Sequence, residues 1–299
     1  MYYAFPPMLH YYDAHQHFHF EDLAPFRATV AADLQAAGVR CAVVNGTNEE
    51  EWPVVAGLAQ QYRWILPSYG VHPWDCGNRS ADWLAKLRTI LEADDQKPAG
   101  LPAAASAKAG VGEIGLDRWI VDGVRPDDPR IAGLRVASMD EQCEVFAAQL
   151  ALAAELDRAA SIHCTQAFGA LHDVLRTTPR PARGFLLHGY GGPVDMIRTF
   201  ADLGAFFSFN LEALQPRLAA RLDNFKAVPV DRLLVETDAP AKAPSAELNR
   251  FPLGQSADGS PINHPANLTA AYAALAELRG LPLEELTTVV ETNFLRLFT

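Results

Sequence analysis

Residues 11–20 read YYDAHQHFHF and place Asp13, His15 and His17 two residues apart. Two residues is the side-chain period of a β-strand, so in an extended chain these three side chains face the same side. Two imidazoles side by side make half of a metal site, and imidazole suits zinc, iron, nickel or manganese. An isolated HxH pair could equally be two surface histidines on an edge strand. Other candidate ligands elsewhere in the chain are needed to distinguish a metal site from this alternative.

Seven more short apolar runs follow this stretch, and segments with helical spacing separate them. The runs are VRCAVVNG (39–46), WILPSYGVHP (64–73), VGEIGLD (111–117), RAASIHC (158–164), RGFLLHGY (183–190), AFFSFN (205–210) and DRLLVETDAP (231–240). Strands that alternate with helices are typical of parallel βαβ units, and eight of them predict an α/β fold, a closed (β/α)8 TIM barrel. A doubly wound open sheet is the competing topology, but the GxGxxG turn that usually follows its first strand is absent.

The chain has 299 residues, of which 49% are hydrophobic, so it can bury a large core. We expect residues 1–299 to form one barrel domain, because a single barrel can use this much chain. An Ala- and Pro-rich segment at about 94–109 has no face that could pack on a core. It predicts a surface loop inserted in the barrel.

Acidic residues outnumber basic ones in this chain, with 25 Lys and Arg against 36 Asp and Glu and a net charge of −11. The protein therefore lacks the overall positive charge of a non-specific nucleic-acid binder. We expect a phosphoester, another small molecule or the ends of DNA as the substrate. A phosphate group has to be attracted locally, which bound divalent cations can do.

The four cysteines, at positions 41, 76, 143 and 164, are scattered without a CxxC pair. This spacing fits reduced thiols better than a disulfide framework or a zinc ribbon, and it predicts a cytoplasmic protein. The opening MYYAFPPMLHYY lacks a basic region and contains two prolines, so it does not resemble a secretion signal. No run approaches the roughly 18 apolar residues of a membrane span.

Polar residues collect where the predicted strands end. His15 and His17 follow the first strand, His72 the third, Glu113 the fourth, His163 the fifth, His188 the sixth and Asp238 the eighth. The carboxyl ends of the strands meet at one mouth of a barrel, where barrel enzymes carry their catalytic groups. We therefore expect these side chains to converge on one site.

Each of these residues also has a purely structural interpretation. His72 and Asp238 could cap turns, and His163 and His188 could be core histidines bonded to backbone carbonyls. These explanations together require several independent coincidences at the same end of the barrel. A functional site is the simpler interpretation.

The motifs DAHQH, GVHP, GEIGLD, SIHC, LLHGYGG, LLVETDAP and NFLRLF occur in this order from about Tyr12 onward. In this respect the chain resembles the TatD family of metal-dependent hydrolases, which includes TatD-type deoxyribonucleases and lies within the amidohydrolase-like barrels. The resemblance implies two divalent ions per chain, of zinc, manganese, magnesium, iron or nickel. It implies that His15, His17, Glu113 and Asp238 hold one ion, and that Glu113, His163 and His188 hold the other.

The same resemblance implies roles for individual residues. Glu113 is the only candidate for a bridging ligand, because no lysine lies at a predicted strand end. Asp238 is the best general base for an attacking water. His72 would contact the phosphate of the substrate, and Asp13 suits the task of holding a ligand imidazole in one tautomer better than that of a metal ligand.

The chain departs from the family pattern in two places. After the fifth strand the family often has His-Ser-Arg, whereas this chain has His163, Cys164 and Thr165, so an arginine that could bind phosphate is missing. After the sixth strand an aromatic Phe-Ser-Gly is replaced by Gly-Tyr-Gly-Gly at 189–192. We expect a phosphoester hydrolase of the deoxyribonuclease type. A small-molecule amidohydrolase or lactonase on the same metals is the alternative, and a non-catalytic metal-binding protein fits less well because a structural zinc site is usually closed.

Overall fold

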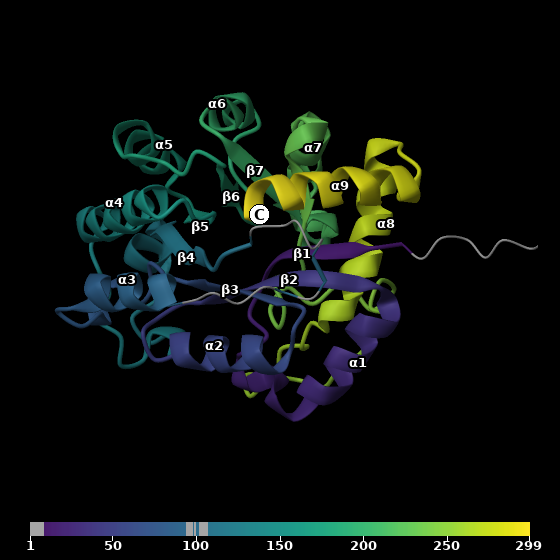
Figure 1. Ribbon diagram of the computed structural model, residues 1–299, viewed down its shortest axis with the longest axis horizontal. Coiled ribbons are helices and arrows are strands. Elements are labelled where there is room, and N and C mark those ends of the chain that lie inside the picture. The colour runs from purple at the N-terminus through teal and green to yellow at the C-terminus, as the bar shows by residue number, and fades with distance from the viewer. Residues whose placement is uncertain (1–8, 94–97, 99, 102–106) are drawn as a thin grey trace, which may run out of the picture.

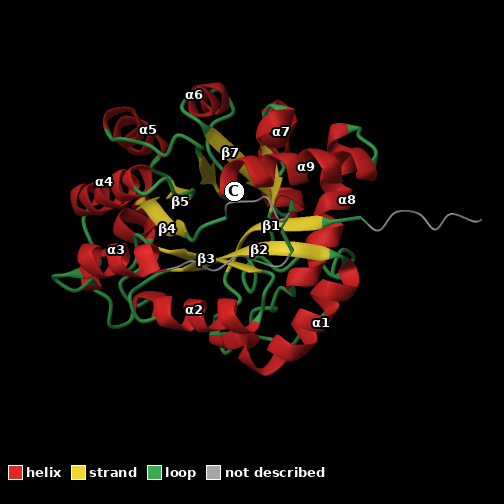
Figure 2. Ribbon diagram, in the orientation of Figure 1, coloured by secondary structure: helices red, strands yellow, loops and turns green. Residues whose placement is uncertain are grey.

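Eight parallel strands form one sheet in the order β1 to β8, and helices surround it (Figures 1 and 2). The computed structural model describes residues 9–93, 98, 100–101 and 107–299. The strands are β1 (Tyr11–Gln16), β2 (Val39–Gly46), β3 (Ile65–Tyr69), β4 (Gly110–Asp117), β5 (Ala160–Thr165), β6 (Phe185–Leu187), β7 (Ala205–Phe209) and β8 (Leu233–Val235). The predicted TIM barrel is confirmed. Most of the surface loop predicted at about 94–109 lies outside the described residues.

Helices follow the strands along the chain and pack on the outside of the sheet (Figure 2). They are α1 (Arg27–Ala37), α2 (Trp52–Gln61), α3 (Trp83–Ala93), α4 (Met139–Glu155), α5 (Phe168–Thr177), α6 (Met196–Asp202), α7 (Ala220–Ala227), α8 (Leu268–Arg279) and α9 (Leu283–Phe298). None of the helices in the described part of the chain has the length and apolar character needed to cross a bilayer.

Local signals in the sequence account for several helix ends. Gly38 ends α1 in the left-handed conformation (φ 84°), which glycine adopts without a steric penalty. Ser138 begins α4, because its Oγ accepts a hydrogen bond of 3.2 Å from the backbone N–H of Glu141. The β-strands are short runs whose residues are nearly all buried, as expected for a parallel sheet covered by helices.

Two buried glutamines on α4 bind the backbone at the end of β4 and just after β3, close to two of the candidate site residues. The Gln149 amide donates to the carbonyl of Val71 (3.0 Å) and accepts from its N–H (2.7 Å), and Gln142 makes the same pair of bonds to Asp117. Each side chain thus satisfies a backbone donor and acceptor that would otherwise be buried without partners. The helix therefore holds the ends of β3 and β4, next to His72 and Glu113.

The first strand meets the segment after the last strand and closes the barrel. The N–H of His17 donates to the carbonyl of Ala239 (2.7 Å), and the N–H of Asp238 donates to the carbonyl of His15 (3.0 Å). The buried carboxylate of Asp13 accepts from the N–H of Thr237 (3.1 Å) and from its hydroxyl (2.6 Å). This seam places the HxH pair beside Asp238, as a closed barrel requires.

Asp13→Asn should weaken this seam, because an amide has one acceptor oxygen where the carboxylate offers two and would turn its own N–H groups toward donors. We expect the free energy of unfolding to fall by about 1–3 kcal/mol, the cost of leaving buried polar groups unsatisfied. Urea unfolding followed by circular dichroism, in the presence of a chelator, measures this. Asp202→Asn, at an exposed position on α6, is the matched control and should change stability little. Equal stability of the two variants would contradict the role of Asp13 in the seam.

Candidate metal centre

The barrel brings the predicted metal ligands and His72 together around the carboxylate of Glu113. Its Oε2 lies 3.4 Å from Nε2 of His15 and 3.2 Å from Nε2 of His17. Its Oε1 lies 3.1 Å from Nδ1 of His163 and 2.9 Å from Nε2 of His188. The two oxygens of one carboxylate thus face two separate pairs of imidazoles.

Asp238 adds a second carboxylate on one side only. Its Oδ1 lies 3.6 Å from Nε2 of His17 and 3.9 Å from Nε2 of His15. Its backbone is in the left-handed region (φ 54°), and the bond from its N–H to the barrel seam holds it there. The three side chains of His15, His17 and Asp238 offer ligand atoms within 4.8 Å of one another.

In His17 and His163, the ring nitrogen that points away from Glu113 makes a hydrogen bond, and this bond determines which nitrogen carries the proton in the neutral ring. Nδ1 of His17 lies 2.8 Å from the carbonyl oxygen of Asn45, which can only accept, so Nδ1 carries the proton and the lone pair of the neutral ring lies on Nε2. Nε2 of His163 lies 3.2 Å from the carboxylate of Asp117, which leaves the lone pair on Nδ1. In both rings the lone pair faces Glu113.

The ring nitrogens that face Glu113 also meet one another in two places. The Nε2 atoms of His15 and His17 are 3.2 Å apart, and Nδ1 of His163 is 3.3 Å from Nε2 of His188. Two lone pairs at these distances repel each other and the adjacent carboxylate unless a proton or a cation lies between them. Protons or cations have to lie between them, and histidine with carboxylate oxygen is a donor set that zinc, manganese and iron accept. The residues present therefore fit a metal centre.

His72 differs from the other four histidines. Its Nδ1 accepts a hydrogen bond of 3.2 Å from the N–H of Trp74, so in the neutral ring Nε2 carries the proton. That N–H points toward Oε1 of Glu113, at 3.4 Å. Although His72, Glu113 and His163 are close enough to hold an ion, the neutral His72 ring presents a donor to the cleft. This arrangement suits a substrate contact better than a metal bond.

The residues that hold the rings were missed in the sequence. Ser161 Oγ lies 2.8 Å from Nδ1 of His15, and Oε1 of Glu236 lies 3.6 Å from Nδ1 of His188. Gly112 makes room for this layer, since a Cβ at this position would lie 2.8 Å from Cβ of Ser161. Glu236 could have been suspected from VETDAP, because it is a charged residue at the end of an apolar run.

Asp13 contributes in another way than we expected. Its carboxylate accepts from the backbone N–H of His15 (3.2 Å), from the Gln16 amide and from Thr237, and among the described residues no ring nitrogen is a partner. It therefore positions the His15 backbone, while Ser161 contacts the ring. Burial raises the pKa of Asp13, whereas the hydrogen bonds from Thr237 and His15 stabilise the carboxylate and oppose the rise.

The electrostatics of the centre favour positive charge. Burial alone would lower the pKa of His17, but hydrogen bonds to Asp238 and Glu113 outweigh it and raise that pKa to about 10. Burial opposes ionisation of Glu113, yet the rings of His72, His188 and His15 hold its pKa well below the ordinary value. The carboxylates are thus ionised at neutral pH and stabilise cations on the imidazoles, whether protons or metal ions.

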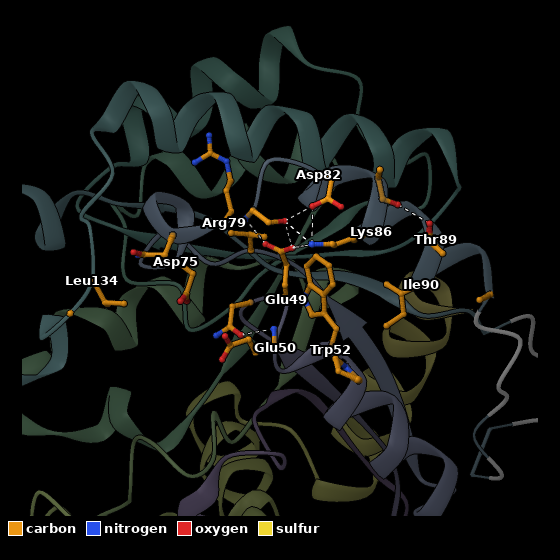
Figure 3. A pocket seen from close by; sticks show the side chains of 18 residues that line it. Glu49, Glu50, Trp52, Asp75, Arg79, Asp82, Lys86, Thr89, Ile90 and Leu134 are labelled. Carbon is orange, nitrogen blue, oxygen red and sulfur yellow. Dashed lines mark hydrogen bonds and ion pairs between the residues drawn. The ribbon is translucent and has the colours of Figure 1, made fainter.

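The centre lies in an open cleft of about 1280 Å³ whose lining includes His17, His72, Glu113 and Asp238. A second cavity, of about 1100 Å³, is lined by parts of α2, α3 and the loop after β3 (Figure 3). Its charged groups satisfy one another, since Glu49 accepts from the N–H of Ser80 (2.7 Å) and from Lys86 (3.2 Å). The histidine-rich cleft is therefore the candidate site.

Comparison with known proteins agrees with this centre. The sequence profile of the family described as TatD related DNase matches residues 12–299. This chain belongs to the TatD family. It is a metal-dependent hydrolase of the TatD type, as the resemblance in its motifs implied.

Several TatD relatives are similar along nearly the whole chain. An uncharacterized metal-dependent hydrolase, YjjV, from Escherichia coli (strain K12) is 30% identical over 289 residues, which cover 96% of each chain. A 3'-5' ssDNA/RNA exonuclease TatD from Klebsiella pneumoniae (strain 342) is 29% identical over 90% of each chain. A crystal structure of YJJV, a TatD homolog from E. coli K12, superposes with a TM-score of 0.77 at 27% identity and covers 96% of this chain and 97% of that one.

Metal binding by this TatD-family chain should release protons. Because the pKa of His17 is raised to about 10, its ring is protonated at pH 8 in metal-free protein, and a metal has to displace that proton. Metal affinity should therefore rise as the pH increases toward about 10 and fall as it decreases. Titration calorimetry with manganese, in buffers that differ in ionisation enthalpy, measures the protons released. An observed enthalpy that is the same in all buffers would contradict this expectation.

Proposed function

We propose that this enzyme hydrolyses phosphodiester bonds of single-stranded nucleic acid, using two divalent ions held on the two sides of Glu113. The observation that carries the proposal is the convergence of two imidazole nitrogens on each oxygen of one carboxylate. The exonuclease relatives support the substrate class, because their names specify single-stranded DNA and RNA. We further propose that residues 12–299 act as one catalytic domain in the cytoplasm.

We assign ligands to two ions from the contacts described above. His15, His17 and Asp238 surround the side of Glu113 that carries Oε2, and they would hold the first ion. His163 and His188 face Oε1 and would hold the second ion with it. Two ions held by these residues would supply positive charge to one phosphate group of the substrate.

The protein's own residues would divide the remaining work. When bound, the divalent ions supply positive charge that stabilises the phosphate in the transition state and makes a water molecule more acidic. Asp238 would accept the proton of that water, since its carboxylate is at the mouth of the cleft and ionised. His72 would donate from Nε2 to a phosphate oxygen. The hydroxyl of Ser161 and the backbone carbonyl of Asn45 would keep the rings of His15 and His17 aligned.

A small-molecule lactonase or amidohydrolase is the second candidate. The specific observation in its favour is Thr165, which stands where the family often has an arginine that can bind phosphate; its hydroxyl lies 3.0 Å from Nε2 of His163. A carbonyl substrate needs no phosphate partner. Parallel assays of a single-stranded oligonucleotide, a generic phosphodiester and a panel of lactones and amides decide between the two.

Glu113→Gln should damage both metal sites together, because a neutral amide cannot bridge two cations as a carboxylate does. We expect elemental analysis to give about two ions per chain for the native protein and fewer than one for the variant. Glu144→Gln, at an exposed position on α4 outside the cleft, is the control and should keep both ions. Two ions and full activity in Glu113→Gln would show that this carboxylate is not the bridge.

Asp238→Asn should separate catalysis from metal binding. The amide oxygen can still contact a metal, but the group no longer accepts a proton, so metal content should fall modestly while turnover of a single-stranded oligonucleotide drops by about 10²-fold or more. Steady-state kinetics together with elemental analysis of the same preparation measures both effects. Near-normal turnover would remove Asp238 from the role of general base.

A further inference from the structure

Three cationic side chains gather around one carboxylate at the side of the cleft formed by the loops after β7 and β8. Nζ of Lys242 lies 3.1 Å from Glu212, and the guanidinium groups of Arg217 and Arg221 each lie 3.3 Å from it. All four residues line the same cleft as His188 and Asp238. We call these three cations the Glu212 cluster.

The Glu212 cluster has more positive charge than its carboxylate can balance. In the described part of the chain, Glu212 is the one carboxylate that these three cations contact. Three positive charges against one negative charge leave an excess of two, in a protein whose net charge is −11. Each arginine has five N–H donors, and the described bonds use one donor of Arg221 and two of Arg217. The remaining donors are available to an anion.

Hydrogen bonds connect Glu212 to Glu236, whose carboxylate lies beside a ring of the metal centre. The N–H of Glu212 donates to Oδ1 of Asn210 (3.1 Å), and Nδ2 of Asn210 donates to Oε1 of Glu236 (2.8 Å). The same oxygen of Glu236 faces Nδ1 of His188 at 3.6 Å. Glu212 itself is buried, with 7% of its surface exposed, so the three cations contact a carboxylate that is held in place while their own side chains remain accessible from the cleft.

Arg221 also occupies a space that the local sequence leaves open. A Cβ built on Gly191 would lie 3.0 Å from Cζ, Nε and Nη2 of this arginine, so the guanidinium lies directly on the backbone after β6. A larger residue at 191 would force the guanidinium to move. The glycine-rich stretch 189–192 is one of the two places where the chain departs from the TatD pattern, and the arginine missing at Thr165 is the other.

The rest of the cleft has the opposite charge. Asp22, Asp75 and Asp258 line other parts of it, and the guanidinium of Arg130 is paired with the carboxylate of Asp128 at 2.7 Å. An anionic chain that leaves the metal centre is therefore attracted to the Glu212 cluster and repelled from those acidic positions. The charge distribution therefore favours one path for an anionic chain through the cleft, from the metal centre toward the Glu212 cluster.

We propose that Arg217, Arg221 and Lys242 bind a backbone phosphate next to the scissile one in a single-stranded nucleic acid, and so replace the arginine that this chain lacks after β5. This proposal rests on the proposed function and names the substrate group that the cleft recognises outside its metals. It predicts that these residues affect substrates with several phosphates and leave substrates with one phosphate unaffected.

The test uses the double variant Arg217→Gln/Arg221→Gln, in which Lys242 remains to pair with Glu212. Binding is measured by fluorescence anisotropy, with a 5'-labelled oligothymidylate and metal-loaded protein that carries Asp238→Asn to prevent cleavage. We expect the Kd to increase about 10-fold or more, and the slope of log K against log salt to become shallower by about 0.7 for each cation removed. Lys226→Gln, which removes an exposed cation on α7 that pairs with Asp223, is the control and should change neither quantity.

Turnover of two substrates by the variant with Asp238 intact gives a second measurement. The KM for the oligonucleotide should rise about 10-fold or more with little change in kcat, whereas hydrolysis of bis(4-nitrophenyl) phosphate, which has a single phosphate, should be unaffected. An unchanged Kd and salt slope in the double variant would overturn the phosphate subsite, and so would an equal loss on both substrates. Absence of turnover of either phosphodiester by the native enzyme would instead overturn the proposed function, and the binding measurement would still decide on the subsite.

Discussion

The carboxylate of Glu113 is the group on which the other residues of the centre depend. It is buried and ionised, and the rings of His72 and of the four candidate ligands His15, His17, His163 and His188 face its two oxygens. Where these rings present lone pairs, they repel the carboxylate in a medium that screens charge poorly, unless a proton or a metal ion lies between them. The centre is thus stable as a cluster only when protons or metal ions occupy it, which couples metal binding to pH and makes metal chemistry the natural use of the site.

The barrel supplies the positions that this cluster needs. Its seam places His15 and His17 beside Asp238 through direct backbone bonds, and the Asp13 carboxylate ties Thr237 to the first strand. Gln142 and Gln149 attach α4 to the end of β4 and to the segment after β3, which helps to place the strand that carries Glu113 and the loop that carries His72. Stability and function are therefore linked, because the same backbone bonds that close the barrel determine the distances between the ligands.

The sequence predicted the barrel and the convergence of the candidate ligands, because both leave local signals. The strands are short apolar runs, and the ligands follow them in a motif order that identifies a family. Asn45 was missed because its contact with His17 is made by a backbone carbonyl, which no side-chain pattern reveals. Ser161 was missed because a neutral side chain inside a buried run looks like any other strand residue, and its contact with His15 joins strands that are 146 residues apart. The role of Asp13 changed for the same reason, since its main partner is Thr237, 224 residues away. The Glu212 cluster could not be predicted either, because its cations come from three separate loops and helices.

Anomalous X-ray diffraction from crystals of the manganese-loaded protein tests the central claim most directly, since it locates each ion without reference to activity. The account predicts two anomalous peaks on opposite sides of the Glu113 carboxylate, one in contact with His15 and His17 and one in contact with His163 and His188. A single peak at full occupancy, or two peaks of which one does not contact Glu113, would contradict it.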